Sequence, residues 1–201
     1  MNATACLSSV IGDRIKSERQ AHGWTLDRLA EAASVGRRTL VNVEQGTANP
    51  SIGILLRLSD ALGVGLPALV EPPETAAVKV VRRGEGTALW SSNQGGEGIL
   101  VGGTGPPDVV ELWDWTLGPG DEHGSEPHAP GTMELVQVLA GSVTMTVDGQ
   151  AFDLAAGDAV TFPGDVRHSY VNPERKAARF TLVVFEPKVG AAARGREGND
   201  G

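Results

Sequence analysis

The chain has 201 residues, of which 40% are hydrophobic and 21% charged, a composition typical of one or two compact domains with their own cores. It holds no apolar run long enough to span a bilayer, its first ten residues lack the features of a signal peptide, and it has one cysteine. We therefore expect a cytoplasmic protein with no membrane segment and no internal disulfide.

The formal net charge of -8 is unevenly distributed along the chain. Residues 1–70 contain seven Arg or Lys and six Asp or Glu, a balance of +1, whereas residues 71–201 contain ten and nineteen, a balance of -9. The acidic part is unsuited to contact DNA, and the near-neutral part gains little affinity from the release of counterions. DNA binding by the first part should therefore depend on a specific site, on two copies, or on both.

The first seventy residues show the apolar period of helices. This period predicts a first helix at residues 9–22. Its inward residues are expected to be Val10, Ile11 and Ile15. Thr25 is a suitable N-cap for a second helix, and Asp27 lies in the first turn, where the helix dipole favours a carboxylate. The apolar residues of this second helix share one face: Leu26, Leu29, Ala30 and Ala33.

A tight turn at residues 34–36 and a third helix at residues 37–44 follow directly. Leu40 and Val43 are the clear apolar anchors of this helix, so its other side should point away from the bundle. Arginine and asparagine on that side can address guanine and adenine edges in a DNA major groove, and arginine can also grip phosphates. We therefore predict a helix-turn-helix whose DNA-binding residues are Thr25, Arg37, Arg38, Val41 and Asn42.

Two more helices complete the first half of the chain. Ser51 opens a fourth helix that Gly63 ends, and a short fifth helix is predicted at residues 66–70. The stretch rich in Pro and Glu that follows is typical of a linker. This organisation gives an all-α, five-helix domain at residues 9–70 and a linker at residues 71–77.

The pattern from Ile11 to Val64 resembles the Xre/Cro-type helix-turn-helix. The resemblance rests on residues 55–64 and on the segments Trp24-Thr25-Leu26, Leu29-Ala30, Glu44-Gln45-Gly46 and Asn49-Pro50-Ser51. Two positions depart from the family: Ser34 replaces the turn glycine, and Gly36 replaces the usual Ser or Thr N-cap. A left-handed Ser34 would cost on the order of 1 kcal/mol relative to glycine, which the fold can tolerate. The alternative is a five-helix bundle that only mediates protein contacts.

From residue 78 onward, short strand-like runs between Gly and Pro turns replace the helical period. Asp148-Gly149 is a strong hairpin signal between alternating apolar residues. The expected strands span residues 78–81, 98–101, 109–117, 135–139, 143–147, 159–162, 168–171 and 178–185. Many short strands with no helix between them predict an all-β jelly-roll barrel at residues 78–188. Residues 189–201 are rich in Ala, Gly and charge, and we expect them to form a disordered tail.

A buried polar cluster is expected inside this barrel. Glu134 shares a face of its strand with Val136 and Val138, so its carboxylate should enter an apolar interior, where it needs a cation or hydrogen-bond donors. His128 lies six residues earlier, and His168 opens a later strand. Two imidazoles and one carboxylate suit Zn²⁺ or Fe²⁺, and also Mn²⁺ or Ni²⁺. We predict a metal site at His128, Glu134 and His168 with Glu126 as a fourth ligand, and a ligand-binding site formed by Glu126, His128, Glu134, His168 and Tyr170.

The β half resembles the cupin fold through two motifs that are partly present. The first is Gly120-x5-Glu126-x-His128-x5-Glu134-x6-Gly141, and the second is Gly157-x5-Pro163 followed by His168-x3-Asn172. The family's first motif offers two histidines one residue apart and then a glutamate three or four residues later. Here either Glu126 replaces the first histidine, with one extra residue before Glu134, or His128 is the first and Pro130 replaces the second.

Alternatives remain open for the residues inside the barrel. The cluster either holds one divalent metal ion or forms a hydrogen-bonded group in a metal-free pocket, as in many sensor cupins. Trp113 and Trp115 should project to the same side of one strand, where they serve as core or stack on a ligand. His123 lies in a Gly-rich acidic loop and is expected to be solvated rather than liganding.

Together the two halves resemble the Xre-type regulators with a C-terminal cupin sensor. The resemblance implies a homodimer whose reading helices lie about 34 Å apart on a palindromic double-stranded DNA operator, and a small-molecule effector whose binding in the barrel changes that spacing. The rival interpretation is a mononuclear non-haem metal-dependent oxygenase or epoxidase with an accessory helix-turn-helix. We favour the regulator, with no catalytic residues, because the metal motif is degraded while the reading helix keeps Arg37, Arg38 and Asn42.

Overall fold

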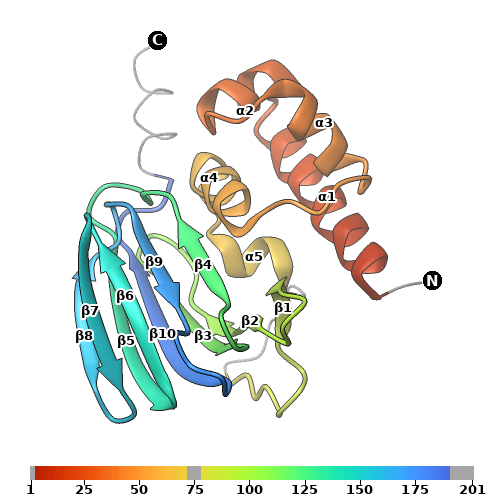
Figure 1. Ribbon diagram of the computed structural model, residues 1–201. Coiled ribbons are helices and arrows are strands. Elements are labelled where there is room, and N and C mark those ends of the chain that lie inside the picture. The colour runs from red at the N-terminus through yellow and green to blue at the C-terminus, as the bar shows by residue number, and fades with distance from the viewer. Residues whose placement is uncertain (1–2, 72–77, 191–201) are drawn as a thin grey trace. The chain divides into compact units, whose positions relative to one another are not determined.

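The computed structural model describes residues 3–71 and 78–190, with side chains from residue 7 onward (Figure 1). Contacts between residues divide it into two compact units, one helical and one built from strands. No helix in these ranges is long and apolar enough to cross a membrane. Apart from Glu71, Val189 and Gly190, the linker expected at residues 71–77 and the tail expected at 189–201 lie outside the described residues.

The helical unit contains the five predicted helices. They are α1 (Ala3–Ala21), α2 (Leu26–Ala32), α3 (Arg37–Glu44), α4 (Ile52–Leu62) and α5 (Leu66–Val70). The first helix begins earlier than predicted, at Ala3 rather than at residue 9. Ile11 and Ile15 are buried on one face, whereas Val10 is exposed because it lies about 100° around the helix from Ile11. The prediction that Val10 points inward is therefore wrong.

Helices α2 and α3 form the predicted helix-turn-helix. Thr25 caps α2, because its hydroxyl accepts a hydrogen bond of 3.1 Å from the backbone amide of Arg28. Ser34 has a φ of 51°, the left-handed conformation in which glycine is usual. The buried Leu40 and Val43 anchor α3, as predicted.

Helices α1 and α3 pack closely against each other. A Cβ atom on Gly12 would lie 2.3 Å from the carbonyl oxygen of Val43, so this approach requires glycine. Further along α1, Arg19 donates from Nε and Nη2 to the two carboxylate oxygens of Glu44, at 2.6 and 2.8 Å. The two side chains are only 11% and 7% exposed, so water competes little for them. This bidentate ion pair ties the end of α1 to the end of α3.

The second unit consists of two antiparallel sheets. Its strands are β1 (Thr87–Ser91), β2 (Glu97–Gly103), β3 (Val109–Leu117), β4 (Glu122–Ser125), β5 (Met133–Ala140), β6 (Ser142–Val147), β7 (Gln150–Ala155), β8 (Ala159–Pro163), β9 (His168–Val171) and β10 (Ala178–Glu186). The six-stranded sheet has the order β1-β2-β3-β10-β5-β8, and the four-stranded sheet has the order β4-β9-β6-β7 (Figure 1). Alternate residues of β3, β5 and β10 are buried and form the core, among them Trp113, Trp115, Val136, Val138, Phe180 and Leu182. The expected all-β architecture is therefore confirmed.

The boundaries of several strands differ from the prediction. Residues 78–81 are not a strand, and Val78 and Val80 are exposed without a sheet to pack on. Conversely, β1 and β4 were not predicted. The sequence of β4, Glu-His-Gly-Ser, has little strand propensity. This strand forms because β9 supplies the hydrogen-bond partners of its backbone. The hairpin at Asp148-Gly149 is confirmed, with φ values of 47° and 80°.

The bidentate pair of Arg19 and Glu44 should contribute measurably to the stability of the helical unit. We predict that Arg19→Met lowers the free energy of unfolding by about 2 to 3 kcal/mol, because it leaves the carboxylate of Glu44 desolvated without its cation. The measurement is urea denaturation of the full chain, followed by circular dichroism at the helical band. The control is Arg179→Met, which removes an exposed pair with Asp114 and should cost less than about 1 kcal/mol. Equal costs would contradict this account.

Candidate functional site

Glu134 lies at the centre of a buried polar cluster in the strand unit. Its side chain points inward from β5 beside Val136, and Glu134 is 1% exposed. Its Oε1 atom lies 2.8 Å from Nε2 of His128 and 3.2 Å from Nε2 of His168. Its Oε2 atom accepts a hydrogen bond of 2.5 Å from the hydroxyl group of Tyr170. The structure thus brings the predicted histidines, glutamate and tyrosine together, and both carboxylate oxygens have partners.

Backbone hydrogen bonds hold the elements of this cluster in place. His128 lies in the loop before β5, and its amide donates to the carbonyl of Gly164 at 3.0 Å. The Gly164 amide in turn donates to the carbonyl of Thr132 at 2.8 Å. His168 and Tyr170 are two residues apart on β9, so their side chains face the same way. A Cβ atom on Gly164 would lie 3.2 Å from Oε1 of Glu134, so a larger residue would crowd the carboxylate.

The cluster shifts the proton affinities of its members. Burial by itself would raise the pKa of Glu134, but hydrogen bonds from His128 and His168 and their positive charge outweigh it and hold that pKa at about 2. Burial would lower the pKa of His168, but its hydrogen bond to Glu134 and the charge of that carboxylate raise it above the usual value. Burial and the neighbouring carboxylate raise the pKa of Tyr170 well above 10, so its hydroxyl stays a donor.

The backbone around His168 decides which of its ring nitrogens carries a proton. Nδ1 of His168 lies 2.8 Å from the carbonyl oxygen of Val166, which can only accept, so Nδ1 is protonated. Nε2 then faces a carboxylate oxygen, and two lone pairs at that distance would repel. Nε2 must therefore carry a second proton, or a cation must lie between it and Glu134. An imidazole whose other N–H donates to a backbone carbonyl is the usual arrangement of a metal-binding histidine.

The donor atoms of the cluster fit a divalent metal ion. One atom from each of His128, Glu134 and His168 lies within 4.8 Å of the others. Ligands about 2.1 Å from a common ion lie roughly 3 to 3.4 Å apart, close to the two distances between the histidines and Oε1. The predicted fourth ligand, Glu126, is not part of this group. Its carboxylate is exposed and pairs with Arg167 at 2.7 Å.

Aromatic rings surround the cluster on one side. Trp113 and Trp115 are buried, so the expectation that they project to one side is confirmed. The expectation that His123 is solvated is wrong, because its ring packs 4.6 Å from that of Trp115 and 5.3 Å from that of Trp90. Burial, and to a lesser extent the charge of His168, lower the pKa of His123 to about 4. His123 is therefore a neutral part of the aromatic core.

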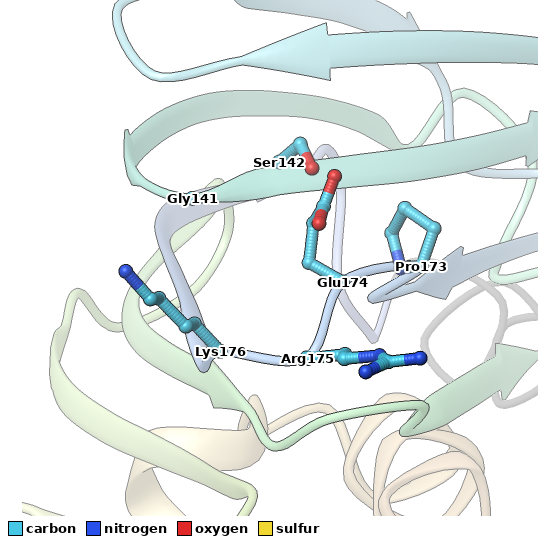
Figure 2. A pocket seen from close by; sticks show the side chains of 6 residues that line it. All are labelled: Gly141, Ser142, Pro173, Glu174, Arg175 and Lys176. Atoms are coloured by element: carbon cyan, nitrogen blue, oxygen red, sulfur yellow. The ribbon is translucent and has the colours of Figure 1, made fainter.

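A separate cleft lies at the surface of the strand unit, by the loop between β9 and β10. It has a volume of about 600 Å³ and is lined by Gly141, Ser142, Pro173, Glu174, Arg175 and Lys176 (Figure 2). Arg175 and Lys176 extend from the loop in opposite directions, while Glu174 extends toward Ser142 (Figure 2). The charged groups of this cleft do not converge on one point, whereas the groups around Glu134 do. The cluster is therefore the stronger candidate for a specific site.

The predicted DNA-binding residues lie on or next to α3. Arg37 and Arg38 are exposed, and Val41 and Asn42 are half-buried. The hydroxyl group of Thr25 is engaged in capping α2. The sequence did not predict that Arg37 is paired: its Nε lies 2.6 Å from a carboxylate oxygen of an acidic residue in the first turn of α2, Asp27.

The cluster should make the metal-free protein less stable at both low and high pH. The pKa of Glu134 is lowered by folding, so its contribution is present above pH 4.5 and is lost as the pH falls from 4.5 toward 2. The pKa of His168 is raised by folding, so its contribution is present below pH 6.5 and is lost as the pH rises through the raised pKa. We predict that the free energy of unfolding is largest near pH 6.5, because the lowered pKa of His123 costs stability as the pH falls below 6.5, and that it falls above this pH by up to about 1.4 kcal/mol per pH unit.

The measurement is chemical denaturation in the presence of a chelator at a series of fixed pH values. The control is Glu134→Gln, which keeps the shape of the side chain but removes the charge that raises the pKa of His168. Its stability should no longer fall above pH 6.5. A fall of the same size in this variant would show that other groups cause it.

Two families match separate parts of the chain. Residues 15–69 match the helix-turn-helix family, and residues 113–185 match the cupin domain family. Over 185 residues the chain is 27% identical to the HTH-type transcriptional regulator SutR of Escherichia coli (strain K12), covering 90% of this chain and 98% of that protein. Over 161 residues it is 26% identical to the HTH-type transcriptional regulator PuuR of the same organism, covering 80% of this chain and 86% of that protein.

A solved structure shows a similar fold along almost the whole chain. It is that of an HTH_3 family transcriptional regulator from Vibrio cholerae, with a TM-score of 0.68 and 23% identity, and the match covers 92% of this chain and 99% of that one. SutR and PuuR are named as regulators rather than as enzymes, which decides against the oxygenase interpretation. The chain is a DNA-binding transcriptional regulator of the helix-turn-helix class that carries a C-terminal cupin domain.

Proposed function

We propose that this regulator acts in the cytoplasm as a homodimer on a specific double-stranded DNA operator, and that a small-molecule effector at the Glu134 cluster changes its affinity for that operator. The observation that carries the DNA-binding part is the arrangement of α3. This helix buries Leu40 and Val43 and leaves Arg37 and Arg38 exposed at its N-terminal end. In helix-turn-helix proteins the N-terminal residues of the second helix contact base edges in the major groove.

Four of the five predicted DNA-binding residues can be given separate roles in this proposal. Arg38 and Asn42 lie four residues apart, one turn along α3, and present donors suited to guanine and adenine edges. Val41 would contact a thymine methyl group. Thr25 caps α2 and would approach the DNA backbone, where contacts fix orientation rather than sequence.

The first test is direct. A selection of genomic fragments with the purified full chain should recover a palindromic site, and Arg38→Ala or Asn42→Ala should each weaken binding to it by about 1 to 3 kcal/mol. Binding to random DNA of the same length is the control and should change much less. Equal weakening on both DNAs would mean that these residues only contact phosphates. Recovery of no selective fragment would contradict the proposal of a specific operator.

We propose that the outer face of the six-stranded sheet forms the contact between two copies. Leu112 on β3 and Leu135 on β5 are 43% and 45% exposed, and both lie opposite Val183 of the intervening strand β10. Val110 and Phe185 extend this apolar row by one further pair. A surface of this kind can pair with its own copy across a two-fold axis. Two copies would also supply the second half-site contact that a near-neutral DNA-binding domain needs.

The expected result is a dimer mass, about twice 20.9 kDa, in light scattering after size exclusion at micromolar concentration. The double variant Leu112→Glu with Leu135→Glu should shift the mass toward the monomer, because it places two charges in the proposed contact. The control is Phe152→Glu, which places a charge at an exposed apolar residue of the other sheet. A wild-type monomer, or a double variant that remains dimeric, would contradict the proposed contact.

We propose that His128, Glu134 and His168 hold one divalent ion, of Zn, Fe or Mn. The support is the donor set, its spacing, and the N–H of His168 that donates to Val166. The ion would supply the positive charge that the buried carboxylate of Glu134 otherwise receives from a protonated imidazole. Tyr170 would keep Glu134 oriented through its hydroxyl group, and an effector would bind beside this group.

Metal analysis of protein purified without chelator should find about one equivalent per chain. His128→Ala and His168→Ala should each lose it, because two remaining donors bind a divalent ion far more weakly than three. His22→Ala is the control, since this histidine lies in the helical unit and its Nδ1 donates to the backbone carbonyl oxygen of Glu18. No metal in the wild type, or the same content in all three variants, would leave a metal-free cluster in which the effector itself pairs with Glu134.

A further inference from the structure

We propose that Asp27 positions Arg37 for base contact and thereby sets how strongly the regulator distinguishes its operator from other DNA. This inference deepens the proposed operator binding and rests on it. It concerns two exposed charged residues on neighbouring helices, of which Asp27 belongs to α2 and Arg37 to α3. Their pair is exposed, so its direct effect on stability is small.

The closest contact of the pair is through Nε of the guanidinium group. Nε of Arg37 lies 2.6 Å from Oδ1 of Asp27. A guanidinium held through Nε can still form the two parallel hydrogen bonds with which arginine recognises guanine. Because Arg37 is the first residue of α3, its side chain lies at the end of the helix that enters the major groove in this class of protein.

The pair should affect operator and random DNA in opposite directions. An arginine that is already held loses less conformational freedom when it binds a base, so Asp27 should strengthen binding where Arg37 meets its matching base. Random DNA is bound through its phosphates, and there the negative charge of Asp27 only opposes binding. Arg38, by contrast, has no ion pair within the described part of the chain, so no carboxylate holds its side chain.

The same helix offers a matched control for charge alone. Glu31 lies one turn after Asp27 on α2, is exposed, and makes no ion pair in the ranges that the structure describes. Removal of either carboxylate changes the net charge of the helical unit equally. Only removal of Asp27 releases Arg37. Any difference between the two variants therefore reports positioning rather than net charge.

The experiment measures the dissociation constants of full-length protein for the operator fragment and for a random duplex of the same length at one salt concentration. Asp27→Ala should reduce the ratio of the two affinities by about two- to tenfold, the range that the ordering of one side chain spans. Glu31→Ala should leave the ratio unchanged within about twofold. Asp27→Asn, which keeps an oxygen that can accept from Nε, should retain more of the ratio than Asp27→Ala.

A second arm asks whether Asp27 acts through Arg37. In the Arg37→Ala background, Asp27→Ala should no longer alter the ratio, because its partner is absent. The inference is overturned if Asp27→Ala and Glu31→Ala change the ratio equally, or if Asp27→Ala has its full effect without Arg37. If the wild type itself shows no preference for any fragment, the operator proposal fails as well. If the wild type is selective while the variants disagree with these expectations, only this inference fails.

Discussion

The buried carboxylate of Glu134 is the constraint on which the chemistry of the strand unit depends. A charge in an apolar interior is tolerated only if it is fully matched, and here two imidazoles and a phenol match both of its oxygens. This requirement fixes where the loop before β5 and the strand β9 can lie. It also makes the protonation state of the cluster depend on the charges beside Glu134. What occupies the space beside Glu134 sets the charge of the whole cluster.

The helical unit uses its charged residues in a different way. The largely buried pair of Arg19 and Glu44 holds α1 against α3, and the close approach at Gly12 fixes their separation. These contacts hold α3 through the side that packs against α1. The residues on its outer side are therefore available for DNA recognition. The exposed pair of Asp27 and Arg37 belongs to this outer surface. Charged pairs of the same chemical kind therefore hold α3 against α1 on one side and, in our proposal, serve recognition on the other.

Sequence patterns predicted the helices and most strands because burial imposes a period on the chain. The hairpin at Asp148-Gly149 followed from local conformational preferences, whereas the left-handed turn at Ser34 followed from the resemblance to the helix-turn-helix family. The strand β4 did not, because its pairing with β9 comes from tertiary contacts and leaves no local signal. Glu134 and the three polar residues around it, His128, His168 and Tyr170, were predicted from strand alternation and spacing. The carbonyl of Val166 was not, since a backbone group that orients a side chain has no signature in the sequence.

We propose that the Glu134 cluster and the operator site are energetically coupled within one regulator. It is tested most directly by the operator dissociation constant of the full chain, measured with chelator, with one equivalent of Zn²⁺, Fe²⁺ or Mn²⁺, and with candidate effectors, for the wild type and for Glu134→Gln. We expect one of these additions to shift the wild-type affinity by about 5- to 150-fold, the usual range for coupled sites, and to leave the variant unchanged. A folded Glu134→Gln protein that shows the same shift as the wild type would contradict it.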